Sequence, residues 1–288
     1  MPLIRRPWLR RIVLAVCASA ALAGCAVLDV KQSDWIFRPV REDWRGFVSV
    51  PAGIEEVWLT LPGGKERLHA WWAPREGAPV LLYLHGARWN LSGSSFRIER
   101  WRAMGFAVLA IDYRGFGRSD GERPSEAQAY EDARTAWQWL VARVPEPSRR
   151  FIYGHSLGGA IAIDLATQLS GDAAAGLIIE STFTSIRDVI AASDYGWLPV
   201  GLLITQRFEA EEKMRRVRLP TLIMHGTADR VIPHEMADRL FAAAPEPKRL
   251  VKFEGTNHSG SAWRAAEAYA QAVHGFVSLI ATDKSAAR

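Results

Sequence analysis

Residues 150–170 read RFIYGHSLGGAIAIDLATQLS. A short apolar run at 151–153 is followed by GHSLG at 154–158 and then by an apolar segment of helical length. A G-x-S-x-G pattern between a strand and a helix is typical of a nucleophile elbow, a sharp turn that exposes a serine hydroxyl. We therefore predict that Ser156 is a nucleophile. The alternative is a serine that only caps the following helix.

Apolar runs of strand length alternate with longer amphipathic segments along the chain. The runs lie at residues 80–84, 107–111, 151–153, 176–179, 221–224 and 250–253, and the candidate helices at about 94–104, 125–144, 157–170, 233–243 and 260–280. This alternation predicts an α/β fold, with a mostly parallel sheet flanked by helices on both faces. Two runs at 57–61 and 68–72, separated by Pro-Gly-Gly, predict an antiparallel hairpin at the sheet edge.

Two stretches depart from this rhythm. Residues 25–50 have no clear period and carry scattered aromatic residues, which is typical of a tether. The stretch from about 182 to 218 mixes apolar and charged residues, which predicts a small cap inserted after a strand. The chain of 288 residues can bury one large core, and we place a single domain at 51–282.

The first 24 residues form a candidate export signal. Four arginines precede a short apolar run at 12–23, and Leu-Ala-Gly then leads to Cys25. Small residues before a cysteine resemble the lipobox of bacterial lipoproteins, which implies cleavage after residue 24 and lipid modification of Cys25. Because Cys17 lies in the leader, the mature chain would have no disulfide. The alternative is an uncleaved, weakly anchored segment.

The leader also explains the net charge of +5. Its four arginines account for most of the basic excess, and no acidic residue precedes Cys25. The remaining chain is nearly balanced in charge and offers no basic surface for phosphate backbones. We therefore predict no nucleic-acid partner.

A serine hydroxyl needs a general base, and the base needs an acid to orient it. In this type of fold the acid and then the histidine follow the serine, each after a later strand. The run at 221–224 leads to Asp229, and the run at 250–253 leads to His258. Because parallel strands end at the same edge, we expect Ser156, Asp229 and His258 to meet. We assign His85, His155 and His225, at other strand ends, to loop packing.

Acyl transfer also needs donors for the oxyanion of its tetrahedral intermediate. The backbone N–H of Leu157, directly after the nucleophile, is one candidate. The turn after the run at 80–84 supplies the other, which we place at Ala87. The glycine-rich segment at 112–121 lacks the spacing and the lysine of a phosphate-binding loop, so we interpret it as structural.

Together these motifs resemble the α/β-hydrolase superfamily over nearly all of residues 51–280. The matching segments are His85-Gly86, 112–119, 154–158, 180–185, 225–229 and Asn257-His258. The segment at 180–185 and the small cap look like a branch of membrane-associated serine hydrolases that includes deacylases and esterases. The resemblance implies ester or thioester hydrolysis through an acyl-enzyme, without a metal or organic cofactor. Ala87-Arg88 departs from the asparagine and small residues that are common in that branch.

We therefore predict a monomeric serine hydrolase that cleaves carboxylic esters, either small-molecule esters or acyl lipids. The lipid on Cys25 would anchor it in the bacterial cell envelope, facing the periplasm. Ala26 replaces the aspartate that resembles an inner-membrane retention signal, which favours the outer membrane. The alternatives are a peptidase of the same fold and a non-catalytic lipoprotein that acts as a binding module.

Overall fold

The computed structural model describes Arg11, Leu14, Gly24 and residues 27–194, 196–197 and 200–286. The predicted lipidation site, Cys25, lies outside the described residues, as does nearly all of the predicted signal segment at 1–24. Among the described residues, no helix combines the length and the apolar character that crossing a bilayer requires.

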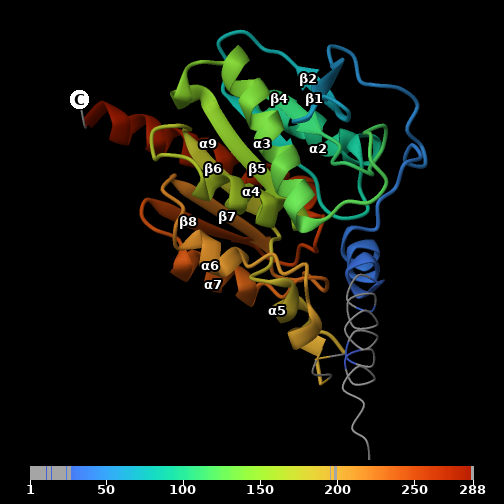
Figure 1. The fold of residues 1–288 in the computed structure, drawn as a ribbon. Helices are drawn as coiled ribbons and strands as arrows, with labels where there is room; N and C mark the ends of the chain where they lie inside the picture. The colour runs from blue at the N-terminus through green and yellow to red at the C-terminus, as the bar shows by residue number, and fades with distance from the viewer. Residues whose placement is uncertain are drawn as a thin grey trace, which may run out of the picture.

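Eight strands form one sheet in the order β1-β2-β4-β3-β5-β6-β7-β8 (Figure 1). The pairs β1–β2 and β2–β4 are antiparallel, and all other neighbours are parallel. The hairpin predicted at the edge is therefore present. The strands are β1 (Glu55–Thr60), β2 (Arg67–Ala73), β3 (Val80–Leu84), β4 (Ala107–Ile111), β5 (Arg150–His155), β6 (Gly176–Glu180), β7 (Thr221–Gly226) and β8 (Lys248–Phe253).

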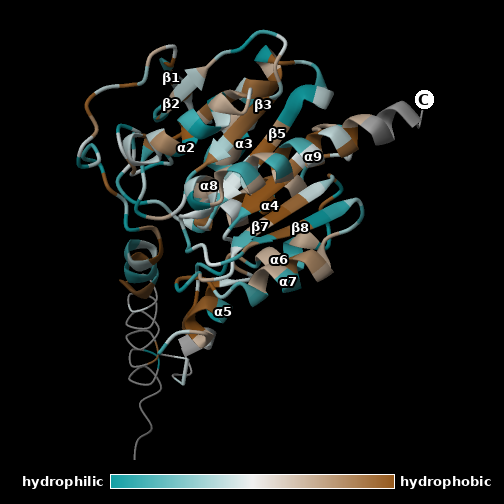
Figure 2. Ribbon diagram, turned by 180° about the vertical axis from the view of Figure 1, so that it is seen from behind, coloured by the Kyte–Doolittle hydropathy of each residue, from teal (hydrophilic) through white to brown (hydrophobic). Residues whose placement is uncertain are grey.

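Helices cover both faces of the sheet, which confirms the predicted α/β class. One apolar core lies under α3 (Glu126–Arg143), α4 (Leu157–Thr167), α6 (Ala210–Met214) and α7 (Glu235–Ala243). A second core lies under α2 (Leu91–Ala103), α8 (Ser261–Arg264) and α9 (Ala266–Ala286). Figure 2 shows β3 and α4 as mainly hydrophobic, as expected for elements at the centre of a layered fold. The 3₁₀ turn η1 (Pro147–Arg149) leads into β5.

Capping side chains set where two of the helices begin. Asn90 accepts a hydrogen bond from the Gly93 amide at 3.0 Å, so α2 begins at Leu91, before the residue 94 expected from the sequence. The hydroxyl of Ser125 accepts from the Gln128 amide at 3.3 Å and starts α3. An N-cap defines a helix start more sharply than the apolar pattern does.

The segment predicted as a cap contains α5 (Ile186–Ala191), the 3₁₀ helix η2 (Val200–Leu203) and α6. The first two lie near the carboxyl ends of the strands (Figure 1). By contrast, α6 packs against α4 and α7 and belongs to the layer that covers the sheet. The cap is thus shorter than the predicted range 182–218, because α6 belongs to the helical layer and not to the cap.

The segment predicted as a tether also has regular structure. Residues 27–37 are helical, and the side chains of Ile36 and Phe37 at its end are buried in the core. Figure 1 shows this helix beside the segment that follows α5. Gln32 donates to the Leu203 carbonyl at 2.7 Å and accepts from the Thr205 amide at 2.8 Å. Tertiary contacts of this kind stabilise a short helix that has little propensity of its own.

Candidate active site

Ser156 occupies a strained turn between β5 and α4. Its φ of 55° and ψ of −120° lie in a region that non-glycine residues rarely adopt, at a cost on the order of 1–3 kcal/mol. Neighbouring glycines permit the turn: a Cβ on Gly154 would lie 2.1 Å from the Gly158 carbonyl oxygen, and one on Gly158 would lie 2.1 Å from that of Leu84. The Ser156 side chain makes no capping hydrogen bond to α4, so the reading of this serine as a simple helix cap does not hold.

Three predicted residues meet at the carboxyl edge of the sheet. The hydroxyl of Ser156 donates to Nε2 of His258 at 3.0 Å, and Nδ1–H of His258 donates to Oδ2 of Asp229 at 2.7 Å. Ser156 follows β5, Asp229 follows β7 and His258 follows β8. This order of hydrogen bonds leaves Nε2 free to take the serine proton, which is the arrangement that activates a hydroxyl nucleophile.

The carboxylate of Asp229 is fully buried, and several groups hold it in place. Its Oδ1 accepts from the amides of Val231 at 2.8 Å and Ile232 at 2.9 Å. Burial opposes ionisation, but hydrogen bonds from His225, His258 and the Ile232 amide outweigh it and hold the pKa of Asp229 below its ordinary value. The carboxylate is therefore ionised at neutral pH and can stabilise an imidazolium.

His225 takes a part that its sequence position did not reveal. We assigned it to loop packing, yet its Nε2 lies 3.1 Å from Oδ2 of Asp229 and 3.1 Å from the Ile232 carbonyl oxygen. Because both neighbours are acceptors, Nε2 carries the proton. His225 thus donates to the same carboxylate oxygen, Oδ2 of Asp229, that accepts from His258.

The residues of the two predicted oxyanion donors, the backbone amides of Ala87 and Leu157, lie beside Ser156. Ala87 and Leu157 both line the cavity that contains Ser156. In the described part of the chain, no backbone carbonyl accepts a hydrogen bond from either amide. The next amide, that of Arg88, donates to the Phe37 carbonyl at 2.9 Å and so ties the loop to the N-terminal segment.

A buried ionic network, which the sequence analysis missed, lies beneath these residues. Nη1 of Arg97 on α2 contacts both carboxylate oxygens of Glu180, at 3.0 Å each. Glu180 ends β6 and also accepts from the hydroxyls of Tyr153 at 2.6 Å and Tyr269 at 2.9 Å. Burial opposes the charge of Arg97, but the Glu180 carboxylate and the neighbouring tyrosines hold the pKa of Arg97 above its ordinary value. The only local signal was a charged residue at the end of an apolar run.

The network reaches the loop that carries His258. Nη2 of Arg97 donates to the Ser259 carbonyl at 3.1 Å, and Nε2 of His155 lies 3.0 Å from the His258 carbonyl oxygen. Burial, with the charges of Arg97 and His258, holds the pKa of His155 well below its ordinary value, so this ring is neutral. The elbow and the histidine loop are therefore joined through buried polar groups, which hold His258 in place relative to Ser156.

The segment at 112–121, interpreted as structural, fits that reading. Oδ1 of Asp112 accepts from the Leu91 amide at 2.8 Å and so anchors the start of α2. The Ser119 hydroxyl donates to the Asp112 carbonyl at 2.7 Å.

Across the described residues, no group of three or more histidine, cysteine or acidic side chains is arranged to hold a metal ion.

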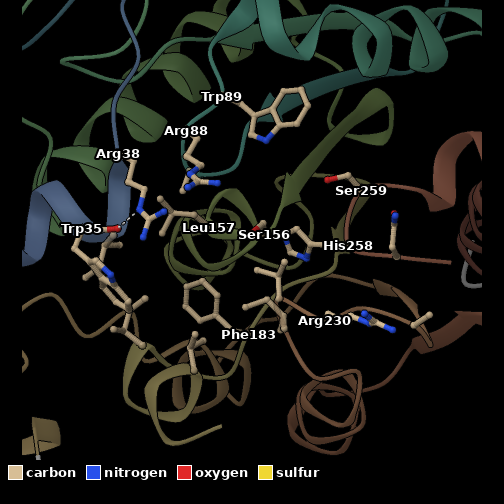
Figure 3. A pocket seen from close by; sticks show the side chains of 18 of the residues that line it. Trp35, Arg38, Arg88, Trp89, Ser156, Leu157, Phe183, Arg230, His258 and Ser259 are labelled. Atoms are coloured by element: carbon tan, nitrogen blue, oxygen red, sulfur yellow. Dashed lines mark hydrogen bonds between the residues drawn. The ribbon is translucent and has the colours of Figure 1, made fainter. Parts of the chain in front are cut away.

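Ser156 and His258 open into a cavity of about 880 Å³ (Figure 3). Its walls are mainly apolar, with Phe183, Ile186 and Val189 on the side of α5. This size suits one small organic ligand. The other lining residues are Trp35, Ile36, Arg38, Trp44, Ala87, Arg88, Trp89, Leu157, Ala228, Arg230, Val231, Ile232, Asn257 and Ser259.

Four of these residues come from the N-terminal segment. Trp35, Ile36, Arg38 and Trp44 lie in the range that the sequence analysis treated as a tether, and Trp44 stacks on Trp89 with ring centroids 4.9 Å apart. The scattered aromatic residues of this segment were the feature of the sequence that could have indicated its packing against the rest of the chain. The segment is thus a wall of the cavity.

The fold is that of the α/β hydrolases. The chain belongs to the Hydrolase_4 family, described as serine aminopeptidase, S33, which matches residues 76–208 and 197–260. The Mycobacterium tuberculosis protein MT2364 is 34% identical over 255 residues, 86% of this chain and 87% of that protein. The lysophosphatidylserine lipase ABHD12 of Danio rerio is 31% identical over 218 residues, 67% of this chain and 56% of the lipase.

Solved structures agree with this assignment. The crystal structure of an α/β hydrolase from Vibrio vulnificus is 26% identical and has a TM-score of 0.65, covering 78% of this chain and 81% of that one. The chain is therefore a hydrolase of this family.

Proposed function

We propose that this protein is a serine hydrolase that cleaves carboxylic esters through an acyl-enzyme. The observation that carries the proposal is the continuous hydrogen-bonded series Ser156, His258, Asp229, which opens into a mainly apolar cavity. The similarity to a protein named as a lysophosphatidylserine lipase supports ester chemistry on an acyl substrate. Thioesters and lipid acyl esters use the same steps.

In the first half of the reaction, Ser156 Oγ attacks the substrate carbonyl while His258 Nε2 takes the hydroxyl proton. Asp229 stabilises the imidazolium that forms. The amides of Ala87 and Leu157 would donate to the oxyanion, which is why their lack of other backbone partners in the described chain matters. Collapse of the intermediate releases the alcohol, which leaves with the proton from His258.

In the second half, a water molecule attacks the acyl-enzyme. His258 takes one water proton, the hydroxyl adds to the acyl carbon, and the second tetrahedral intermediate expels Ser156 Oγ. The proton returns to the serine, and the acid is released. Each proton is thus transferred by one nitrogen that lies 3.0 Å from the serine oxygen.

The charges around the cavity favour an ester over the substrate of an aminopeptidase. Among the described residues that line the cavity, none is acidic, whereas three are arginines. An aminopeptidase must bind a positively charged peptide terminus, which three guanidinium groups repel. The family description includes aminopeptidases, so this difference in charge is the reason for choosing the ester.

The test compares the wild-type chain with Ser156→Ala on p-nitrophenyl esters from acetyl to palmitoyl. Loss of the nucleophile should lower turnover by about 10⁴ to 10⁶. Ser170→Ala replaces an exposed serine three residues beyond the end of α4; it is the matched control and should retain full activity. Equal activity of Ser156→Ala and the wild type would exclude Ser156 as the nucleophile.

Two other outcomes would point to the alternatives. A folded wild-type protein that hydrolyses aminoacyl amides but no ester would be a peptidase. A folded protein that hydrolyses neither, and that does not react with a fluorophosphonate, would be a non-catalytic binding module.

We also propose that the mature chain is a monomer and that the lipid on Cys25 anchors it in the bacterial cell envelope, facing the periplasm. Of the two membranes, we favour the outer one. The lipobox-like residues before Cys25 support this location. Labelling with radioactive palmitate should be lost in Cys25→Ala. Retained labelling would exclude this site of lipidation.

A further inference from the structure

Three arginines stand at the mouth of the cavity. Arg38, Arg88 and Arg230 line it and have exposed side chains. In the described part of the chain, no carboxylate forms an ion pair with any of them; the one side-chain hydrogen bond among them runs from Arg38 Nε to the Trp35 carbonyl, at 3.1 Å. Cations gathered in a mainly apolar cavity, without acidic neighbours on its walls, create a positive potential next to Ser156.

Arg38 and Arg88 are related by more than their charge. Both have left-handed backbone conformations, with φ of 48° and 67°, although neither is glycine. The amide of Arg88 donates to the carbonyl of Phe37, so the backbones at the two arginines are hydrogen-bonded neighbours. A left-handed conformation costs a non-glycine residue on the order of 1 kcal/mol, and such strain gathers at functional sites. In Figure 3 both side chains project toward the cavity, on the side of Leu157.

The fold holds this pair at a constant place relative to the serine. Phe37, next to Arg38, is fully buried and makes edge contacts with Phe208, at 5.8 Å between ring centroids, and with Phe116, at 6.4 Å. Arg88 follows Ala87, whose amide faces the reaction in the proposed mechanism. The N-terminal helix therefore brings one guanidinium to the cavity, and the oxyanion loop brings the other.

We propose that Arg38 and Arg88 bind a negatively charged group of the substrate, and that the substrate is a single-chain acyl ester carrying a phosphate. This inference rests on the proposed ester hydrolysis. Apolar walls accommodate an acyl chain, and guanidinium groups hydrogen-bond phosphate in a planar, two-pronged geometry. A cavity of about 880 Å³ is of the size that binds one such molecule. Arg230, on the side of His258 in Figure 3, adds to the potential.

The experiment uses two esters that differ only by a phosphate, 1-oleoylglycerol and 1-oleoylglycerol 3-phosphate. They are presented to the full chain in a neutral detergent, and kcat/KM is measured for each. The wild type should prefer the phosphate ester, and added salt should weaken this preference because screening acts on exposed charges. In Arg38→Gln and Arg88→Gln the ratio of the two kcat/KM values should fall about tenfold each, mainly through KM.

Two further variants separate a binding role from a structural one. Arg218→Gln removes the same charge from an exposed position just before β7, at the opposite end of the sheet, and should leave the ratio unchanged. Arg88→Lys keeps the charge but lacks the two-pronged geometry, so it should recover part of the preference. If the ratio of the two kcat/KM values fell as much in Arg218→Gln as in the Arg38 and Arg88 variants, the effect would be one of general charge, and the inference would be overturned.

The remaining outcomes are distinct from failure of the proposed function. Hydrolysis of both oleoyl esters at equal rates, unaltered in the two glutamine variants, would overturn the anion site while leaving the ester hydrolase intact. A repeat with 1-acetylglycerol and its 3-phosphate distinguishes a lipid from a small soluble phosphate ester. A phosphate preference confined to the acetyl pair would overturn the single-chain lipid assignment. Failure to hydrolyse any ester would contradict the proposed function itself.

Discussion

Replacement of Glu180 by glutamine should destabilise the protein far more than its conservative size suggests. The side chain is fully buried and is the counter-ion of Arg97, which is itself nearly inaccessible. Glutamine has almost the same shape, so it leaves no cavity. It removes the negative charge and leaves the guanidinium buried without a counter-ion.

The contacts set the size of the effect. Arg97 lies 3.0 Å from each carboxylate oxygen, and both tyrosine hydroxyls donate to the same Oε2. Breaking a buried pair by removing one partner costs about 3–5 kcal/mol, because the remaining charge is uncompensated. Replacing both partners by apolar residues is often nearly neutral. We therefore expect a loss of about 3–5 kcal/mol for Glu180→Gln and a smaller loss for Glu180→Leu combined with Arg97→Met.

Urea unfolding followed by tryptophan fluorescence measures this difference, with the midpoint and slope determined for each variant. Glu131→Gln is the matched control, since Glu131 pairs with Arg114 but its side chain is 36% exposed. An ion pair of that exposure contributes up to about 1 kcal/mol. Activity should also fall in Glu180→Gln, because Arg97 holds the carbonyl of Ser259 next to the proposed base.

A loss below about 1 kcal/mol for Glu180→Gln, equal to that of the control, would refute the reasoning. It would mean that Arg97 finds water or another partner when the carboxylate is removed. A double variant less stable than Glu180→Gln would equally contradict the account, since the cost would then arise from lost hydrogen bonds and not from the uncompensated charge.

Two further predictions concern Asp229 and the N-terminal segment. Because the pKa of Asp229 is lower in the folded chain than in the unfolded chain, the unfolded chain binds more protons in acid, and stability rises with pH there. The difference in the free energy of unfolding between the wild type and Asp229→Asn, measured in urea titrations, should thus be largest above about pH 5 and decrease toward about pH 2. A difference independent of pH would contradict this prediction. Phe37→Ala should cost about 3–5 kcal/mol in urea unfolding, against less than about 0.5 for Val48→Ala at a 93% exposed site. Equal effects would show that the N-terminal helix does not pack on the core.

Features that depend on neighbouring residues were predictable. The alternating apolar runs predicted the strands and helices of the sheet, because burial on both faces imposes continuous apolar segments. The elbow was predictable because its G-x-S-x-G pattern occupies five consecutive residues, between an apolar run and a segment of helical length. The order of serine, acid and histidine followed from the topology, since parallel strands end at one edge. The sequence by itself therefore determined the architecture and the places of Ser156, Asp229 and His258.

Tertiary structure alone decided which distant residues support that site. Arg97 and Glu180 are 83 positions apart, and Gln32 and Thr205 are 173 apart. No local period reports such pairs, because contact depends on how α2, β6 and the N-terminal helix pack and not on their own patterns. The same packing turned an apparent tether into a wall of the cavity and brought Arg38 beside Arg88. Residues that bind or position others from a distance become visible only when the chain has closed around them.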